Sequence, residues 1–183
     1  MQADVRPRRL VYVSYDGTNH ADIEDNVCVN DGSQNNGASP NVLVINDDSS
    51  SIVKHNTLVA FKDSYGNAGG IMSIGSKSSS GSGTTLTDNI ATGFDNCENG
   101  NCRPYAESHN LFVQGGPGGT GDVHGTPAYQ GGACGSLTSS TGPFCSEAWS
   151  NYLLTASSPG HNAADDGTDM GAYGSGPVTP GGP

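Results

Sequence analysis

An asparagine that recurs after short apolar segments constrains the fold of this chain more than any other feature. In three of four occurrences an apolar residue stands three places before the asparagine, and the fourth lacks it. The asparagines are 30, 33 and 21 residues apart, which is typical of a repeat with insertions of variable length. The four segments are Ile23-Glu24-Asp25-Asn26-Val27, Ser51-Ile52-Val53-Lys54-His55-Asn56-Thr57-Leu58, Leu86-Thr87-Asp88-Asn89-Ile90 and Glu107-Ser108-His109-Asn110-Leu111-Phe112.

A short strand that ends in a sharp corner explains this pattern. Asparagine is one of the few non-glycine residues that tolerate the left-handed conformation that a corner can require. If successive coils stack, the asparagine amides lie above one another and hydrogen-bond in a ladder. Coils that cannot bury an apolar side alone then share one core. We therefore predict a column of Asn26, Asn56 and Asn89; the alternative is a set of unrelated asparagine turns.

Length and composition favour a single all-β domain. The chain has 183 residues, and its hydrophobic fraction of 33% is low for a globular protein. No long window carries apolar residues at helical spacing, so a compact helical domain is not expected. Disorder is the competing interpretation of such a polar chain. However, β-rich apolar runs recur at residues 10–13, 42–45, 52–53 and 58–61, which favours a thin core enclosed by polar turns.

Charge argues against one class of partner, and the lengths of the apolar runs argue against a second. The net charge is −11, and the chain has seven basic residues, so it lacks the clustered lysines and arginines that bind a phosphate backbone. Its only basic cluster is Arg6-Pro7-Arg8-Arg9. No apolar run approaches the length of a transmembrane helix. We therefore expect neither nucleic acid nor membrane as a partner.

The five cysteines favour an oxidising compartment. Cys97 and Cys102 bracket four residues, and Cys134 and Cys145 bracket ten, so each pair could close a local disulfide. Zinc is the alternative, but neither pair has the spacing of a zinc knuckle beside a second matching pair. Cys28 is left over in an alternating run and is expected to be a buried thiol. These disulfides predict a secreted, extracellular protein.

The order of motifs in the last third resembles a known family. The matching segments are Asn110-Leu111-Phe112, Gly125-Thr126-Pro127-Ala128-Tyr129, Asn151-Tyr152-Leu153-Leu154, Ser157-Ser158-Pro159-Gly160-His161-Asn162-Ala163 and Asp169-Met170-Gly171-Ala172-Tyr173. Together they resemble the C-terminal end of secreted right-handed parallel β-helix proteins, the pectate-lyase-like superfamily. Thr126 and Gly160 depart from the usual residues of its motifs. The resemblance implies a right-handed parallel β-helix (a solenoid) of few coils with an irregular, loop-rich C-terminal cap.

Composition at the two ends of the chain, and the resemblance over the residues between them, predict a domain organisation. We expect a flexible segment at 1–9, β-helix coils at 10–112, a cap at 113–173 and a Pro/Gly linker tail at 174–183. Members of the superfamily usually carry more coils and an N-terminal cap. The chain is therefore expected to present an uncapped first coil that stacks on another copy or completes the β-helix of a partner.

Polysaccharide lyases of this superfamily use a basic residue to remove a proton and a cation, often calcium, to neutralise the substrate carboxylate. The candidate bases here are Lys54, His55 and Lys62. Lys54 and His55 are adjacent, so on a strand they are expected to point to opposite faces. Glycosidases on the same scaffold use paired carboxylates instead.

Further candidates for ligand binding lie near the first corner and among the tyrosines. Asp22, Glu24 and Asp25, beside His20, could ligate Ca²⁺ or hold a base with its orienting carboxylate, but a solvated coil face is the favoured interpretation. Asp165–Asp169 is expected to be a terminal turn, and Gly115–Asp122 a flexible loop. Sugar rings could stack on tyrosines of the coils, namely Tyr12, Tyr15, Tyr65 and Tyr105.

Two functions from different classes follow. The first is an extracellular β-helix that binds or processes polysaccharide, as a lyase or glycoside hydrolase if it is catalytic. The second is a non-catalytic structural or adhesive subunit that stacks end to end into a fibre or completes a partner's β-helix. Turnover of a polysaccharide, lost in Lys54→Ala or Lys62→Ala, would distinguish the first from the second.

Overall fold

The structure, a computed structural model, describes residues 11–13, 21–30, 43–46, 51–60, 72–75, 84–93, 97–98, 101–102, 106–113, 115–116, 118–131 and 152–174. Within these ranges the chain is all-β and forms no α-helix. The strands are β1 (Val11–Val13), β2 (Asp22–Glu24), β3 (Val27–Asn30), β4 (Leu43–Asn46), β5 (Ile52–Lys54), β6 (Thr57–Ala60), β7 (Met72–Gly75), β8 (Thr85–Thr87), β9 (Ile90–Ala91), β10 (Cys97–Glu98), β11 (Asn101–Cys102), β12 (Ala106–Ser108), β13 (Leu111–Phe112) and β14 (Val123–His124).

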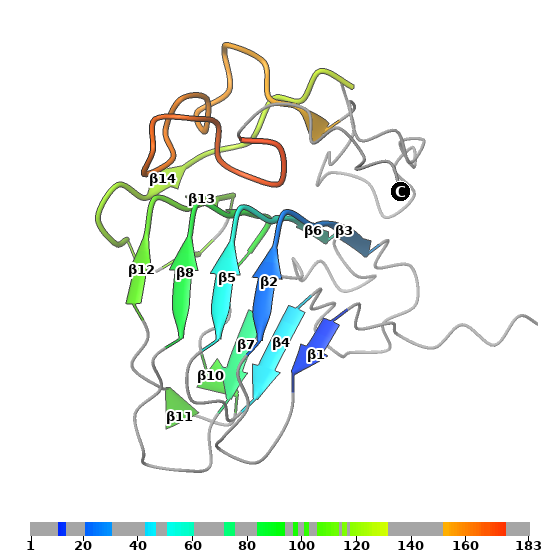
Figure 1. Ribbon diagram of the computed structural model, residues 1–183, viewed down its shortest axis with the longest axis vertical. Coiled ribbons are helices and arrows are strands. Elements are labelled where there is room, and N and C mark those ends of the chain that lie inside the picture. The colour runs from blue at the N-terminus through cyan, green and yellow to red at the C-terminus, as the bar shows by residue number, and fades with distance from the viewer. Residues whose placement is uncertain are drawn as a thin grey trace, which may run out of the picture.

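Parallel pairing dominates the described strands. Three parallel sheets have the orders β1-β4-β7, β2-β5-β8-β12 and β3-β6-β9-β13-β14, and β10 pairs antiparallel with β11. The chain enters the three parallel sheets in the same order three times, as β1-β2-β3, β4-β5-β6 and β7-β8-β9 (Figure 1). The predicted all-β class with parallel strands is confirmed.

Register places the apolar side chains of successive strands in one core. Ile23, Val53 and Leu86 are aligned on β2, β5 and β8, and all three are buried. Their neighbours along each strand are more exposed, which is the alternation expected of a sheet with one buried face. Each such side chain contributes about 1.5–3 kcal/mol when it is fully removed from water.

The predicted asparagine column is confirmed. The Nδ2 of Asn26, Asn56 and Asn89 each donates a hydrogen bond of 3.0 Å to the Oδ1 of the next asparagine, ending at Asn110. The amide of Asn110 in turn faces Asp122 Oδ1 at 3.4 Å. Because every rung donates toward the later coil, the ladder has a direction. Asp122 ends it, because a carboxylate accepts hydrogen bonds and cannot donate the next one.

The prediction that asparagine itself takes the left-handed corner was wrong. The residue before each asparagine has the positive φ instead: Asp25 (56°), His55 (51°), Asp88 (59°) and His109 (53°). These aspartates and histidines belong to the residue types that enter the left-handed region more often than others. The asparagine that follows can then point its amide inward, where Nδ2 of Asn56 reaches the buried carbonyl of Ile23 at 2.7 Å.

Two later segments, residues 118–131 and 152–174, pack against the parallel sheets. In Figure 1 the segment 152–174 (orange to red) lies over the arrowheads of β2, β5 and β8. It shares a core cluster with the sheets, formed by Val59, Ile90, Leu111, Tyr129, Tyr152, Leu154, Ala164 and Met170. The described part of 115–122 is a loop, as predicted, apart from one bridge at Thr120, and its flexibility stays a prediction. Thr120 pairs with Ser108, and β14 then pairs with β13, so the sheets continue beyond residue 112.

Candidate functional site

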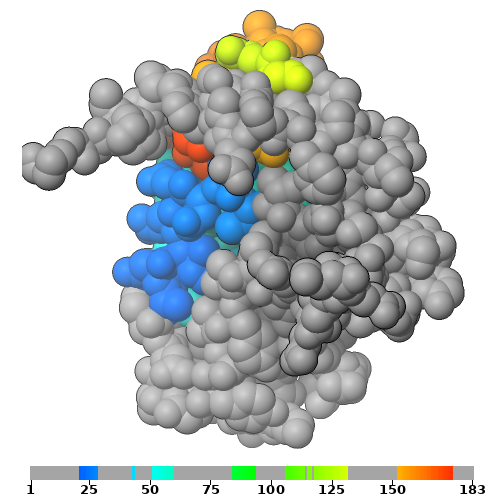
Figure 2. Space-filling view, turned by 90° about the vertical axis from the view of Figure 1, so that its right-hand side faces the viewer, coloured from blue at the N-terminus to red at the C-terminus, as the bar shows by residue number. Residues whose placement is uncertain are grey.

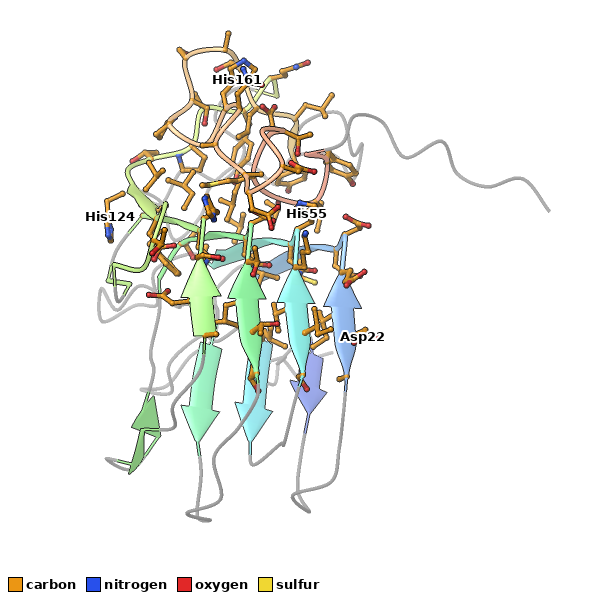
Figure 3. All side chains as sticks on the ribbon, turned by 60° about the vertical axis from the view of Figure 1, so that its left-hand side comes forward. Asp22, His55, His124 and His161 are labelled. Atoms are coloured by element: carbon orange, nitrogen blue, oxygen red, sulfur yellow. The ribbon has the colours of Figure 1, made fainter. Side chains whose placement is uncertain are left out.

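Two of the predicted bases meet at one corner of the molecule. Lys54 Nζ lies 3.5 Å from Asp88 Oδ2 and 3.5 Å from Asp165 Oδ1. His55 Nε2 lies 3.4 Å from the same Asp88 oxygen, and its Nδ1 lies 3.8 Å from Asp25 Oδ1. We call these five residues the corner cluster. Figure 3 shows His55 at the end of β5, directly beneath the C-terminal segment.

The expectation that Lys54 and His55 point to opposite faces was wrong. That expectation assumed an extended strand through both residues, whereas β5 ends at Lys54 and His55 has a φ of 51°. The left-handed turn rotates the imidazole back toward the side of Lys54. Both side chains consequently reach Asp88.

Asp88 is the centre of the corner cluster. Its side chain is 0% exposed, and its Oδ1 accepts a hydrogen bond of 2.8 Å from the backbone N–H of Asp165. Burial raises the pKa of Asp88, and the hydrogen bond from Asp165 and the nearby His55 act against that rise. Asp88 Oδ2 and His55 Nε2 are buried and neither has a hydrogen-bond partner in the described structure.

Lys54 is held as a cation. Partial burial acts to lower its pKa, but the carboxylates of Asp165 and Asp88 outweigh burial, so the pKa of Lys54 is raised. A general base must carry a free lone pair near the operating pH. An ammonium with a raised pKa is therefore poorly suited to remove a proton. Its position instead neutralises the buried carboxylate of Asp88.

The corner cluster joins the sheets to the C-terminal segment. Besides the contacts of Asp165, the backbone N–H of Gly171 donates to the carbonyl of Asp88 at 2.8 Å. The N–H of Ala172 donates to Thr57 Oγ1 at 3.1 Å. His55 retains only 15% side-chain exposure beneath this segment. The arrangement is suited to docking of the segment, and it leaves His55 little room to meet a substrate.

The predicted cation ligands are separated by the corner. Asp22 and Glu24 lie on the exposed side of β2, as their alternation predicts, whereas Asp25 turns toward His55. Figure 2 shows residues 21–28 (blue) at the surface below the red C-terminal segment. In the described ranges no group of three or more His, Cys, Asp or Glu residues gathers to hold a metal ion. Calcium binding stays a prediction.

Other predicted site residues fall wholly or partly outside the described structure. Tyr12 lies in β1 and Cys97 faces Cys102 across β10 and β11, but the side chains of these residues are not described. Cys28 has a free, half-buried thiol, and burial raises its pKa. The predicted disulfides stay predictions. Outside the described residues lie His20, Lys62, Tyr15, Tyr65, Tyr105, Cys134 and Cys145.

Sequence reasoning missed a second pair of ionisable groups, Glu107 and Asp122, which we call the end pair. Glu107 occupies on β12 the inward position that Leu86 fills on β8. Burial, followed by the charge of Asp122, raises the pKa of Glu107 to about 7. The signal was present in the sequence, because Glu107 is where the apolar pattern of the repeat breaks.

No family model matches the sequence, and searches of curated proteins and of solved structures returned no match. The described part of the chain also contains no helix that is long and apolar enough to cross a membrane.

Proposed function

We propose that this chain is an extracellular, right-handed parallel β-helix that binds a neutral polysaccharide along one sheet without cleaving it. Supporting the coil arrangement are the repeated order of the three parallel sheets and the in-register asparagine ladder. The proposed binding face is the outward side of β2, β5, β8 and β12. The resemblance to pectate-lyase-like proteins supports the coil arrangement and a polysaccharide as ligand, whereas the two restrictions, no cleavage and a neutral polymer, rest on the corner cluster and on charge.

The observation that carries the proposal is the alignment of polar side chains on that face. One row contains Glu24, Lys54, Thr87 and Ser108, each the register partner of the next. Parallel strands lie about 4.8 Å apart, so the row repeats hydrogen-bonding groups at constant spacing along the stack. An extended polymer with a regular sequence of hydroxyl groups matches such a row.

The corner cluster favours binding over cleavage. A lyase requires a free base, but Lys54 is paired with two carboxylates and His55 lies beneath the C-terminal segment. Glycosidases need two carboxyl groups that flank the scissile bond. The end pair instead converges on one glycine and leaves no space between its two groups for a sugar.

Charge favours a neutral polymer. Asp22, Glu24 and Asp25 are all exposed, and the chain has a net charge of −11. Like charges repel an acidic polysaccharide unless a cation bridges them. If calcium does so, acidic polymers will bind in its presence and dissociate when a chelator is added.

Binding to a panel of neutral and acidic polysaccharides, with and without chelator, tests the proposal. The double variant Thr85→Ala/Thr87→Ala removes two hydroxyls from the face and should weaken binding roughly tenfold, as expected for two hydrogen bonds. The matched control Thr155→Ala/Ser157→Ala removes two exposed hydroxyls from the C-terminal segment and should leave the affinity unchanged. Absence of binding to every neutral polymer, or release of cleaved sugars, would contradict the proposal.

A second candidate function, association through the first coil, is favoured by the direction of the ladder. Asn26 is exposed, and its Oδ1 accepts no hydrogen bond from the described residues, so the ladder could continue at this end. However, Asp22, Glu24 and Asp25 would repel the same residues of a second copy, as charged edge strands commonly do. The fitting partner is therefore a strand that carries lysine or arginine.

Sedimentation velocity of the triple variant Asp22→Asn/Glu24→Gln/Asp25→Asn tests this second candidate. Neutral side chains remove the repulsion, so the variant should associate end to end where the wild type does not. A variant that sediments as the wild type does at every concentration would count against association through this end.

A further inference from the structure

The last strand of the four-stranded sheet differs from the others at its inward position. Val53 and Leu86 fill this position on β5 and β8, and Glu107 takes it on β12. Glu107 Oε2 is buried and has no hydrogen-bond partner in the described structure. Burying a charged group without a partner costs far more than burying a neutral one. A glutamate at this place therefore requires a nearby group that favours its neutral form.

Asp122 supplies that group. Its Oδ2 accepts a hydrogen bond of 2.8 Å from the N–H of Gly119, and its Oδ1 accepts one of 2.8 Å from the N–H of Asn110. A Cβ atom on Gly119 would lie 2.8 Å from Glu107 Oε1. Both carboxyl groups of the end pair thus converge on the backbone of Gly119. Two ionised carboxylates have only acceptors, so the pair needs a proton to form a hydrogen bond between its members.

The segment that carries Asp122 also closes the end of two sheets. It lies against β12 and β13, whose far edges no other described strand covers. Its backbone hydrogen bonds to the preceding coil run from His109 N to Thr120 O (2.9 Å), from Val123 N to Asn110 O (2.8 Å) and from Gly125 N to Phe112 O (3.1 Å). Separation of this segment would expose the edges of both strands.

We propose that residues 118–125 are a proton-controlled closure of this end of the sheets. They pack against β12 and β13 while Glu107 and Asp122 share a proton, and they separate from these strands when both carboxyls are ionised. The pKa of Glu107, raised to about 7, sets the range in which this happens. Because the closed form holds the proton more tightly, closure is complete at acidic pH and is lost as pH rises through about 7.

Other titratable groups near the end pair could produce a pH dependence of their own. They are His109 at the corner after β12, His124 in β14 and Asp88 at the corner after β8. The β8 residue aligned with Glu107 is the uncharged Leu86. A histidine gains positive charge as pH falls and would attract Asp122, which is an effect of the same sign. The effect of protonating a histidine must therefore be distinguished from the effect of protonating Glu107.

Native-state hydrogen exchange of the Val123 and Gly125 amides between about pH 5.5 and pH 8.5, corrected for the intrinsic rate, tests the closure. In the wild type, the protection of these amides should fall as pH rises. The fall should be at most about tenfold per pH unit, in the range between the pKa of Glu107 in the open form and its higher pKa in the closed form. In Glu107→Gln, which is neutral at every pH, protection should stay constant. The control Glu24→Gln, which alters an exposed carboxyl on the same sheet, should behave as the wild type.

Two histidine variants complete the test. His109→Asn, which tolerates the left-handed corner, and His124→Gln should retain the pH dependence. If Glu107→Gln does not fold, Asp122→Asn gives Glu107 a neutral neighbour, and protection should then vary less with pH. The proposal is overturned if wild-type protection is independent of pH, or if its pH dependence survives in Glu107→Gln and disappears in a histidine variant.

Discussion

Replacement of Asn56 by alanine should destabilise the protein more than the same replacement at Asn26, the exposed end of the asparagine ladder. Asn56 is buried, and its Nδ2 lies within hydrogen-bond distance of Ile23 O (2.7 Å), Lys54 O (2.9 Å) and Asn89 Oδ1 (3.0 Å). Its Oδ1 accepts from the backbone N–H and the Nδ2 of Asn26, at 3.1 and 3.0 Å. One side chain therefore connects three successive coils.

The expected loss follows from which partners can reach water afterwards. In Asn56→Ala the carbonyl of the buried Ile23 loses its hydrogen bond, and an unsatisfied buried group costs about 1–3 kcal/mol. Nδ2 has two protons for three acceptors, so the bonds to Lys54 and Asn89 together add about 1 kcal/mol. The total is about 2–4 kcal/mol of unfolding free energy. The exposed Asn26 can replace its lost partner with water and adds little.

Asn26→Ala is the matched control. It removes the same amide at the exposed end of the ladder, where Nδ2 serves Glu24 O and Asn56 Oδ1. Solvent can satisfy these groups, so the expected loss is about 1 kcal/mol or less. Urea unfolding followed by far-UV circular dichroism, at one pH and one redox condition, measures both variants. Equal losses in the two variants would refute the reasoning, because they would show that depth in the ladder has no energetic consequence.

Three further predictions concern the C-terminal segment and the end pair. Gly171→Ala should cost about 2–5 kcal/mol in urea unfolding, because φ is 91° and a Cβ would lie 2.6 Å from Thr57 Oγ1. The control Gly167→Ala has a similar φ of 81° but open space around it, so about 1–2 kcal/mol is expected. Lys54→Ala should increase proteolysis of the C-terminal segment, because it leaves the buried Asp88 carboxylate uncompensated, whereas Lys54→Arg should not. The free energy of unfolding should fall by about 1–3 kcal/mol between pH 5 and pH 8, because the raised pKa of Glu107 favours the folded state at acidic pH. Glu107→Gln should flatten this pH dependence in the same titration.

The asparagine column could be predicted from the sequence because its signal is local and repeated. An apolar residue, a spacer of two and an asparagine recur at Asn26, Asn56 and Asn89, and stacking is the arrangement that satisfies all the amides together. The parallel strands follow from the same repeat. The left-handed position was misplaced by one residue because asparagine, aspartate and histidine all tolerate it. Sequence propensity alone could not choose among adjacent tolerant residues.

The corner cluster could not be predicted because its partners are distant along the chain. The backbone N–H of Asp165 donates to Asp88 from 77 residues away, and no sequence pattern around either residue predicts this contact. Adjacent positions such as Lys54 and His55 were assigned to opposite faces by the rule for extended strands, which fails where a strand ends. The end pair was partly visible, since Glu107 interrupts an apolar pattern, but its partner Asp122 lies in a glycine-rich segment with no repeat signature.

The corner residues have ionisable side chains for a reason that does not require catalysis. Each corner needs a residue that tolerates a positive φ, and Asp25, His55, Asp88 and His109 meet that need. Stacked corners lie about 4.8 Å apart, so four aspartates in succession would repel one another. Alternation of aspartate with histidine removes that repulsion while it keeps every corner in its conformation. Acid–base pairs at this edge are therefore what stacking alone would select, and a catalytic role would need a substrate contact in addition to these residue types.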